Sequence, residues 1–207
     1  MSGVPGEDLK GSAARLWKLV AERAEPGADT PSIDRRIWDL FGEDWAIMFT
    51  DLAGFSRQVA AFGILHFLQI IWEQQRVLLP IVGDHDGILV KIEADSFLIL
   101  FRRPERALTC AVAMQRAAQA ESSKKRPEER VLLCIGIGYG RILRIGDTDV
   151  FGAEVNAASK LGEDRAKQDE ILVTGAVRAA AGDVPGVSFE QIDVDVPGAD
   201  TCFRVQY

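Results

Sequence analysis

The sequence predicts an α+β fold, because short apolar runs with strand patterning alternate with amphipathic helical segments. Three observations carry this prediction. Residues 45–50 form a buried apolar run, residues 87–101 have the pattern of a β-hairpin, and a helical segment lies on each side of that hairpin. The resulting order β-α-β-β-α-β, with extra strands at the C-terminal end, is that of a ferredoxin-like sandwich.

Two short helices are expected before this core. In the first, residues 13–24, the apolar side chains Leu16, Leu19 and Val20 share one face. The second begins at Asp29-Thr30-Pro31, where a capping residue precedes a proline in the first turn. We therefore expect residues 1–44 to be a helical extension and residues 45–207 to form the main domain.

The first half of the main domain begins with the strand 45–50. A long helix is expected over about 59–79, ending at Pro80. Two β-rich runs, 87–92 and 96–101, follow and are joined by a turn at residues 93–95, which is the spacing of a hairpin.

The second half begins with an amphipathic helix over 104–120. Strands are then expected at 131–137 and 141–145, a helix at 155–165 and a strand at 170–174. The tail from residue 187 alternates in the manner of edge strands.

Composition restricts the partners of this chain. Its 207 residues suffice for one well-packed domain, and its net charge of −7 disfavours a nucleic-acid polymer as the main ligand. No signal peptide and no apolar stretch of about 20 residues is present in the sequence. We therefore expect a cytoplasmic protein with no membrane span.

Two aspartates stand where metal chemistry could occur. Asp51 follows the first strand, and Asp95 lies in the hairpin turn. In a β-α-β-β fold these positions come together, and paired carboxylates suit Mg²⁺ or Mn²⁺ that bridges phosphates. The alternative is purely structural: Asp51 caps the next helix and Asp95 makes the turn.

Four segments together resemble one known family, the class III adenylate and guanylate cyclase catalytic domains. They occur in the family's order and spacing, between about Trp45 and Thr174. The four segments are Phe49–Ser56, Gly87–Phe101, Ile135–Gly140 and Asp149–Leu161.

The resemblance implies a two-metal site. Asp51 and Asp95, with the carbonyl of Leu52, would hold two Mg²⁺ or Mn²⁺ ions per site. The backbone N–H groups of the following turn would bind the triphosphate. That turn comprises Ala53, Gly54, Phe55 and Ser56.

The resemblance also implies a substrate and an assembly. Lys91 and Asp149 match the pair that reads adenine, as a donor to ring N1 and an acceptor from the 6-amino group. Asn156 matches the residue that orients the ribose. The implied reaction converts ATP to 3′,5′-cyclic AMP and pyrophosphate. In this family each site takes its metal aspartates from one subunit and its purine-reading and Asn positions from the other, so a homodimer is expected.

Three departures from the family pattern bear on activity. Lys160 stands where the family usually has arginine, and a lysine lacks the planar guanidinium fork. Residues 196–198 offer a proline near the place of a triphosphate-binding lysine. Glu93, whose side chain can point to solvent, replaces a commoner apolar residue.

Two alternatives stay open, and these departures favour the first of them. One is a catalytically silent cyclase-like domain that binds nucleotide or dimerises. The other is a cyclase for guanine or pyrimidine nucleotides, which would need a different pattern at Lys91 and Asp149.

Overall fold

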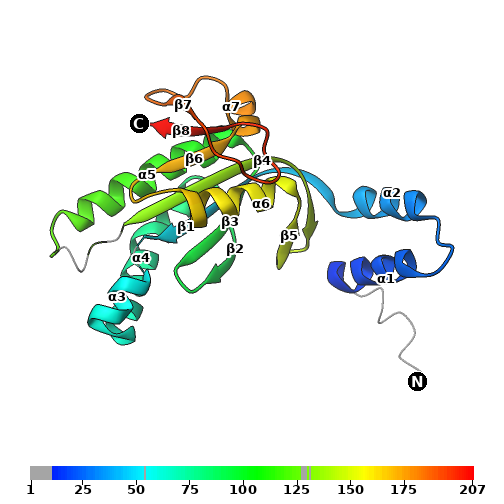
Figure 1. The fold of residues 1–207 in the computed structure, drawn as a ribbon, viewed down its shortest axis with the longest axis horizontal. Helices are drawn as coiled ribbons and strands as arrows, with labels where there is room; N and C mark the ends of the chain where they lie inside the picture. Colours follow the sequence, from blue (N-terminus) through cyan, green and yellow to red (C-terminus); the bar gives the residue numbers. More distant parts are fainter. Residues whose placement is uncertain (1–10, 54, 127–129, 131) are drawn as a thin grey trace.

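The computed structural model describes residues 11–53, 55–126, 130 and 132–207, without the side chains of residues 55–58 (Figure 1). A mixed α+β fold is present, as predicted. The elements in chain order are α1 (Ser12–Ala24), α2 (Thr30–Phe41), β1 (Gly42–Leu52), α3 (Phe55–Phe62), α4 (Ile64–Asp84), β2 (Ile88–Glu93), β3 (Ser96–Phe101), α5 (Pro104–Ser122), β4 (Leu133–Ile145), β5 (Asp149–Phe151), α6 (Ala153–Ser159), η3 (Lys160–Arg165), β6 (Ile171–Thr174), α7 (Gly175–Ala181), β7 (Ser188–Ile192) and β8 (Cys202–Gln206).

A single eight-stranded sheet organises the domain. Seven strands follow the order β2-β3-β1-β4-β6-β8-β7, and β5 pairs with β4 outside this path. The four strands β2-β3-β1-β4 are mutually antiparallel, as in a ferredoxin-like sandwich, and β6 extends the sheet by pairing parallel to β4. The tail strand β8 lies between β6 and β7, so of these two tail strands β7 alone lies at an edge of the sheet, with β2 at the opposite edge.

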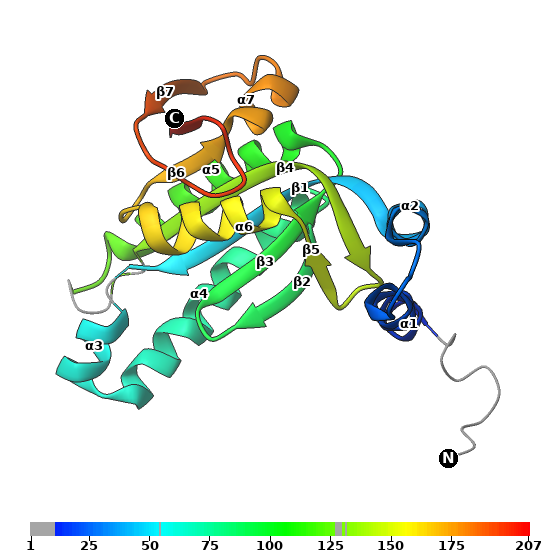
Figure 2. The same ribbon diagram turned by 45° about the vertical axis from the view of Figure 1, so that its right-hand side comes forward.

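Helices cover both faces of this sheet (Figure 2). Ala46 and Met48 of β1 belong to the larger core cluster, which includes α4 and α5. Trp45 and Ile47 belong to a second cluster on the opposite face, beneath α6. Successive residues of a strand point to opposite faces, so an uninterrupted apolar run such as Trp45–Met48 is what a doubly covered strand requires.

The long helix differs from the sequence-based expectation. The chain forms two helices, α3 and α4, which are separated at Gly63, whose φ is 84°. Pro80 lies inside α4 and does not end it. Leu78 and Val82, on either side of the proline, are buried in the core, so tertiary packing outweighs the local cost of the missing N–H.

Three further boundaries differ from expectation. The strands predicted at 131–137 and 141–145 are one strand, β4. The helix predicted at 155–165 is α6 followed by the π-helix η3. Helix α7 was missed, because its seven residues give too short a pattern to be recognised.

The N-terminal helices form a hairpin that projects from one end of the domain (Figure 1). As expected, the Asp29 side chain caps α2 by accepting a hydrogen bond from the Ser32 N–H at 3.1 Å. Leu19 and Ile37 pack in a separate small core with Ile145 at the end of β4. Within the described parts of the chain, no helix is both long and apolar enough to cross a bilayer.

Close packing of helix on sheet depends on a glycine in β4, which gives a first prediction. A Cβ on Gly136 would lie 2.2 Å from the Ala158 carbonyl oxygen and 2.3 Å from the Gly162 nitrogen. We expect Gly136→Ala to lower the free energy of unfolding by at least about 1–3 kcal/mol, because the contacting backbone atoms cannot move aside without distorting the helices that carry them. Urea unfolding measures this loss.

Gly83 near the end of α4 is the matched control. A Cβ there meets no atom within 4 Å. Gly83→Ala should leave stability unchanged or raise it by about 0.5–1 kcal/mol, because alanine favours the helix. Equal destabilisation by both substitutions would contradict the assigned packing.

Candidate functional site

The two predicted metal aspartates come together at one end of the sheet. Asp51 is the penultimate residue of β1, and Asp95 lies in the turn between β2 and β3. Antiparallel pairing places Thr50 of β1 opposite Phe97 of β3, which brings the end of β1 beside the hairpin turn. The sheet register therefore holds the two carboxyl groups side by side.

Burial perturbs both carboxyl groups, and the charge of Asp95 adds to the effect on Asp51. Burial, followed by the negative charge of Asp95, raises the pKa of Asp51 to about 6. Burial also raises the pKa of Asp95, whose side chain is 7% exposed. The Oδ2 atom of Asp95 is buried and has no hydrogen-bond partner among the described residues. Two adjacent carboxylates with one unpaired buried oxygen fit a divalent cation.

Side chains alone would leave such a cation with few ligands. The described residues contain no group of three or more His, Cys, Asp or Glu side chains arranged to hold a metal. Mg²⁺ commonly binds one or two carboxylates and takes its other ligands from water and substrate phosphates. Asp51 and Asp95 therefore suit an ion that arrives with a phosphate-bearing ligand.

Two buried polar side chains support this end of the sheet, and no local sequence pattern marks either of them. The Thr50 hydroxyl accepts a hydrogen bond from the Phe97 N–H at 3.1 Å. The Gln74 side chain, fully buried on α4, donates from Nε2 to the Asp95 carbonyl oxygen at 3.3 Å. They tie the hairpin turn to β1 and to α4.

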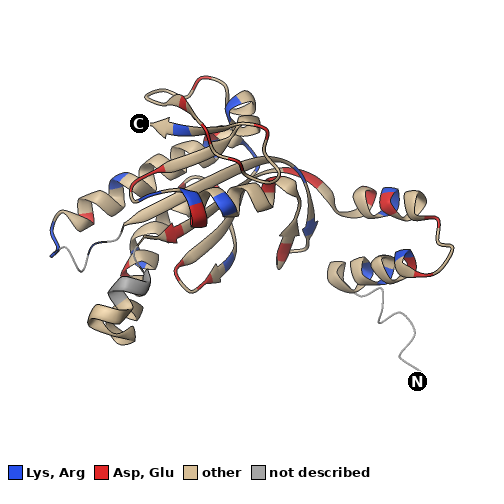
Figure 3. Ribbon diagram, viewed as in Figure 1, with Lys and Arg blue, Asp and Glu red and all other residues tan. Residues whose placement is uncertain are grey.

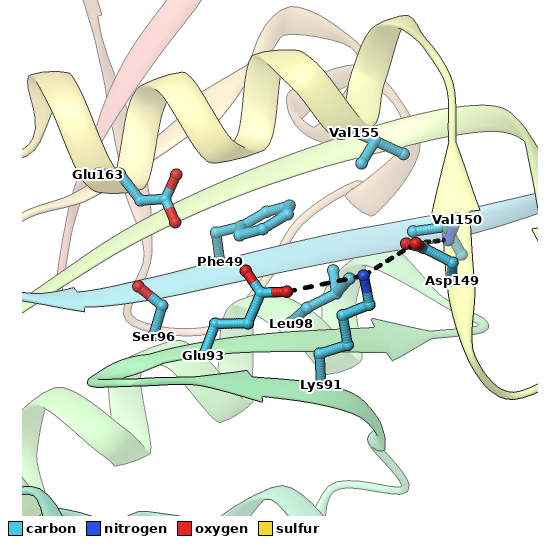
Figure 4. A pocket seen from close by; sticks show the side chains of 9 residues that line it. All are labelled: Phe49, Lys91, Glu93, Ser96, Leu98, Asp149, Val150, Val155 and Glu163. Carbon is cyan, nitrogen blue, oxygen red and sulfur yellow. Dashed lines mark hydrogen bonds and ion pairs between the residues drawn. The ribbon is translucent and has the colours of Figure 1, made fainter.

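A pocket opens on the α6 face of the sheet (Figure 4). Its lining includes Ser96, the residue after Asp95, and Phe49, two residues before Asp51. Its floor is apolar and its rim carries four charged side chains. The lining residues are Phe49, Lys91, Glu93, Ser96, Leu98, Asp149, Val150, Val155 and Glu163.

Lys91 and Asp149 meet across this pocket, although 58 positions separate them in the chain. Lys91 Nζ donates to Asp149 Oδ2 at 2.8 Å, and the two side chains are 34% and 35% exposed. This hydrogen bond is the main cause of a raised pKa for the Lys91 ammonium. The other carboxylate oxygen of Asp149 accepts from the Val150 N–H at 2.9 Å, which fixes the carboxylate plane.

Two glutamates for which the family resemblance implies no role also line the pocket. Glu93 Oε1 lies 3.7 Å from Lys91 Nζ, although the side chain is 74% exposed. Glu163 comes from η3, and its charge contributes to the raised pKa of Asp51. Since η3 packs on β1 and β4, tertiary structure alone brings Glu163 here, and no local motif could reveal it.

The predicted ribose and phosphate residues lie outside this pocket. Asn156 is exposed on α6, and Lys160 is exposed on η3. Lys160 Nζ pairs with Asp164 Oδ2 at 2.6 Å, both side chains being more than half exposed. Neither residue lines the Lys91 pocket of its own chain.

The predicted anion-binding turn is described only in part. The Ala53 N–H donates to the Leu132 carbonyl oxygen at 2.8 Å, so it is engaged by backbone and not offered to an anion. Gly54 lies outside the described residues, as do the side chains of Phe55 and Ser56. Helix α3 begins at Phe55, and the first N–H groups of a helix lack partners within it.

Comparison with known proteins identifies the family. The family model described as "Adenylate and Guanylate cyclase catalytic domain" matches residues 42–203. "Putative adenylate cyclase 3" of Rhizobium meliloti (strain 1021) is 32% identical over 117 residues, which cover 56% of this chain and 20% of that protein. "Serine/threonine-protein kinase pkn2" of Myxococcus xanthus is 25% identical over 138 residues, 67% of this chain and 16% of the kinase. The chain thus spans a fifth or less of the length of these curated relatives.

Solved structures of cyclase domains share the fold. An "Adenylate/Guanylate Cyclase/Hydrolase" from Silicibacter pomeroyi is 25% identical with a TM-score of 0.70, and the similarity covers 80% of this chain and 98% of the other. The adenylyl cyclase CyaB from P. aeruginosa is 18% identical with a TM-score of 0.67, over 80% and 95% of the two chains. Together with the family match over residues 42–203, these likenesses show that the chain belongs to the adenylate and guanylate cyclase catalytic domain family.

Proposed function

We propose that this domain converts ATP to 3′,5′-cyclic AMP and pyrophosphate as a homodimer. The observation that carries this proposal is the contact between Lys91 Nζ and Asp149 Oδ2 at 2.8 Å in a pocket of the sheet's α6 face. It places a hydrogen-bond donor directly next to an acceptor, above the apolar floor formed by Phe49 and Leu98.

This arrangement suits adenine better than guanine. Adenine presents an acceptor at N1 beside a donor at its 6-amino group, and these meet Lys91 and Asp149 respectively. Guanine presents a donor at N1 and an acceptor at position 6, so both contacts would be mismatched in the same orientation. Unsatisfied polar groups in a binding site cost enough to discriminate strongly between substrates.

Asp51 and Asp95, with the carbonyl of Leu52, are the residues we assign to divalent cations. Two bound ions would lower the pKa of the attacking ribose hydroxyl and stabilise negative charge on the departing phosphates. The 3′-oxygen attacks the α-phosphorus, the bond to the bridging oxygen breaks, and pyrophosphate leaves. The unpaired Oδ2 atom of Asp95 and the repulsion between the two carboxylates support this assignment.

Asn156 and Lys160 are assigned to the ribose and the phosphates of a nucleotide held partly by a second copy. Both are exposed and lie outside the Lys91 pocket, so they are accessible to a nucleotide whose base is held by Lys91 and Asp149 of the same chain and whose metal ions are held by the aspartates of the neighbouring subunit. Exposed apolar side chains on α3, α4 and β2 offer surface for such a subunit, and the first turns of α4 carry no charged residue (Figure 3). These side chains are Phe62, Ile64, Leu65, Leu68, Trp72, Ile88, Leu89 and Ile92.

One observation favours a second candidate, a nucleotide-binding or dimerisation module without catalysis. Lys160 already has Asp164 as a partner at 2.6 Å. A phosphate would have to compete with that carboxylate, and a lysine lacks the bidentate geometry of arginine. Cyclase activity therefore depends on whether the triphosphate displaces Asp164 from Lys160.

The first functional prediction is production of cyclic AMP. The purified chain with Mn²⁺ should form cyclic AMP from ATP, and Asp51→Ala should lower kcat/KM at least about 100-fold, because a metal ligand is lost. Product is quantified by chromatography, and the other three nucleoside triphosphates are assayed as substrates in parallel. Asp39→Ala, which removes an exposed carboxylate on α2, is the matched control and should match the parent.

Absence of any cyclic product from all four triphosphates at high protein concentration would rule out catalysis. A thermal shift that ATP still produces would then support the binding-module candidate, because a ligand bound only by the folded state raises the melting temperature. Faster turnover of GTP than of ATP would overturn the assignment of Lys91 and Asp149.

Shared active sites predict complementation between inactive variants. Asp51→Ala and Asn156→Ala should each be nearly inactive alone. Mixed in equal amounts they should recover about a quarter of the parent activity, since half of the dimers are mixed and each has one intact site of two. Doubling the amount of either variant alone is the control. No recovery after subunit exchange, shown by mass spectrometry of labelled dimers, would mean that one chain supplies a whole site.

The repulsion between the aspartates predicts a stability effect in metal-free protein. The folded-state pKa of Asp51, about 6, exceeds its ordinary value of 3.8, so folded protein binds a proton more tightly and loses stability as pH rises between these values. Asp51→Asn removes the charge and should raise the free energy of unfolding at pH 7.5 by about 1–2 kcal/mol.

Urea unfolding in a chelator measures this difference. It should shrink at pH 4, where the parent carboxyl is protonated in the folded state and already partly protonated in the unfolded state, and Asp39→Asn should show no such pH dependence. A variant less stable than the parent at pH 7.5 would contradict the repulsion.

A further inference from the structure

Three charged side chains stand in a row on the rim of the pocket. Lys91 Nζ lies 2.8 Å from Asp149 Oδ2 and 3.7 Å from Glu93 Oε1. Figure 4 shows the ammonium group between the two carboxylates, with Asp149 on one side and Glu93 on the other. In hydrogen-bonding terms the row is acceptor, donor, acceptor.

We propose that Glu93 reads position 2 of the purine ring, so that the pocket favours a purine with amino groups at positions 6 and 2. This inference rests on the proposed function, which places the 6-amino group at Asp149 and ring N1 at Lys91. The next position along the same edge of the base is C2. Because Glu93 lies on the far side of Lys91 from Asp149, it faces that position.

The backbone holds the row in place. Lys91 and Glu93 are alternate residues of β2 and therefore point to the same face of the sheet. Asp149 is fixed by the hydrogen bond that its other oxygen accepts from the Val150 N–H. A base that approaches Lys91 and Asp149 thus meets a second carboxylate, that of Glu93, at a place set by β2.

Each purine satisfies this row to a different extent. 2,6-Diaminopurine presents donor, acceptor, donor and pairs with Asp149, Lys91 and Glu93 in turn. Adenine has only a C–H at position 2, so it pairs with the first two and leaves Glu93 to solvent. Guanine has the 2-amino group but is mismatched at Asp149 and Lys91. The expected order of preference is diaminopurine, adenine, guanine.

The size of the effect is limited by solvent. Glu93 is 74% exposed, and screening weakens any contact that it makes. A hydrogen bond to a charged group in such a place changes affinity by roughly 3- to 10-fold.

The test compares ATP with its 2-amino analogue on the full chain with Mn²⁺. The parent should show a kcat/KM for 2-amino-ATP about 3- to 10-fold above that for ATP. Glu93→Ala should bring the ratio of the two values close to 1, and Glu93→Gln should retain part of the preference through its carbonyl oxygen. Glu25→Ala, which removes an exposed glutamate beyond the end of α1, should keep the parent ratio.

A parent ratio of 1 or below would overturn the inference, and so would a ratio that Glu93→Ala leaves unchanged. In either case, turnover of ATP would leave the proposed function standing. If neither triphosphate is cyclised, the proposed function fails, and the same ratio is taken from dissociation constants measured by calorimetry. A preference for 2-amino-ATP that Glu93→Ala abolishes then still supports the role of Glu93. No binding of either triphosphate overturns both.

Discussion

The strand β1 is the constraint on which the rest of the structure depends. It is hydrogen-bonded to β3 on one side and β4 on the other, and it is covered by helices on both faces. A strand enclosed in this way has one register, because a slip by one residue would exchange Ala46 and Met48 with Trp45 and Ile47 between two differently shaped cores. Asp51 at its end is therefore held firmly against the hairpin turn that carries Asp95, despite the repulsion between the two carboxylates.

The glycines of β4 set the second half of the site. Gly136 and Gly138 have no room for a Cβ, because the backbone of α6 and η3 lies directly on them. This approach places Glu163 on the pocket rim beside the end of β1, and the turn from β4 into β5 brings Asp149 to Lys91. The pocket is thus formed by the closeness of a helix to a sheet, and its charged rim comes from three separate parts of the chain.

Local physics explains which features could be predicted from the sequence. The strand at Trp45, the hairpin around Asp95 and the capped helix after Asp29 depend on neighbouring residues, and each was predicted from alternation or turn chemistry. Pro80 was misjudged because a helix with buried residues on both sides of a proline is stabilised by contacts distant in sequence. The pairing of Lys91 with Asp149 followed from the family resemblance, while Glu163 and Gln74 are positioned by tertiary packing and were missed.

Charge balance determines how this site can accept a nucleotide (Figure 3). Glu93, Asp149 and Glu163 line the pocket against the single ammonium of Lys91, and Asp51 and Asp95 lie beside it. A triphosphate adds further negative charge to this acidic surface, so nucleotide binding without cations would be opposed by repulsion. The same repulsion raises the affinity of the aspartates for a divalent ion. Under the proposed function, cation and triphosphate would therefore favour each other's binding, and a cation at the aspartates would offset the repulsion that contributes to the raised pKa of Asp51.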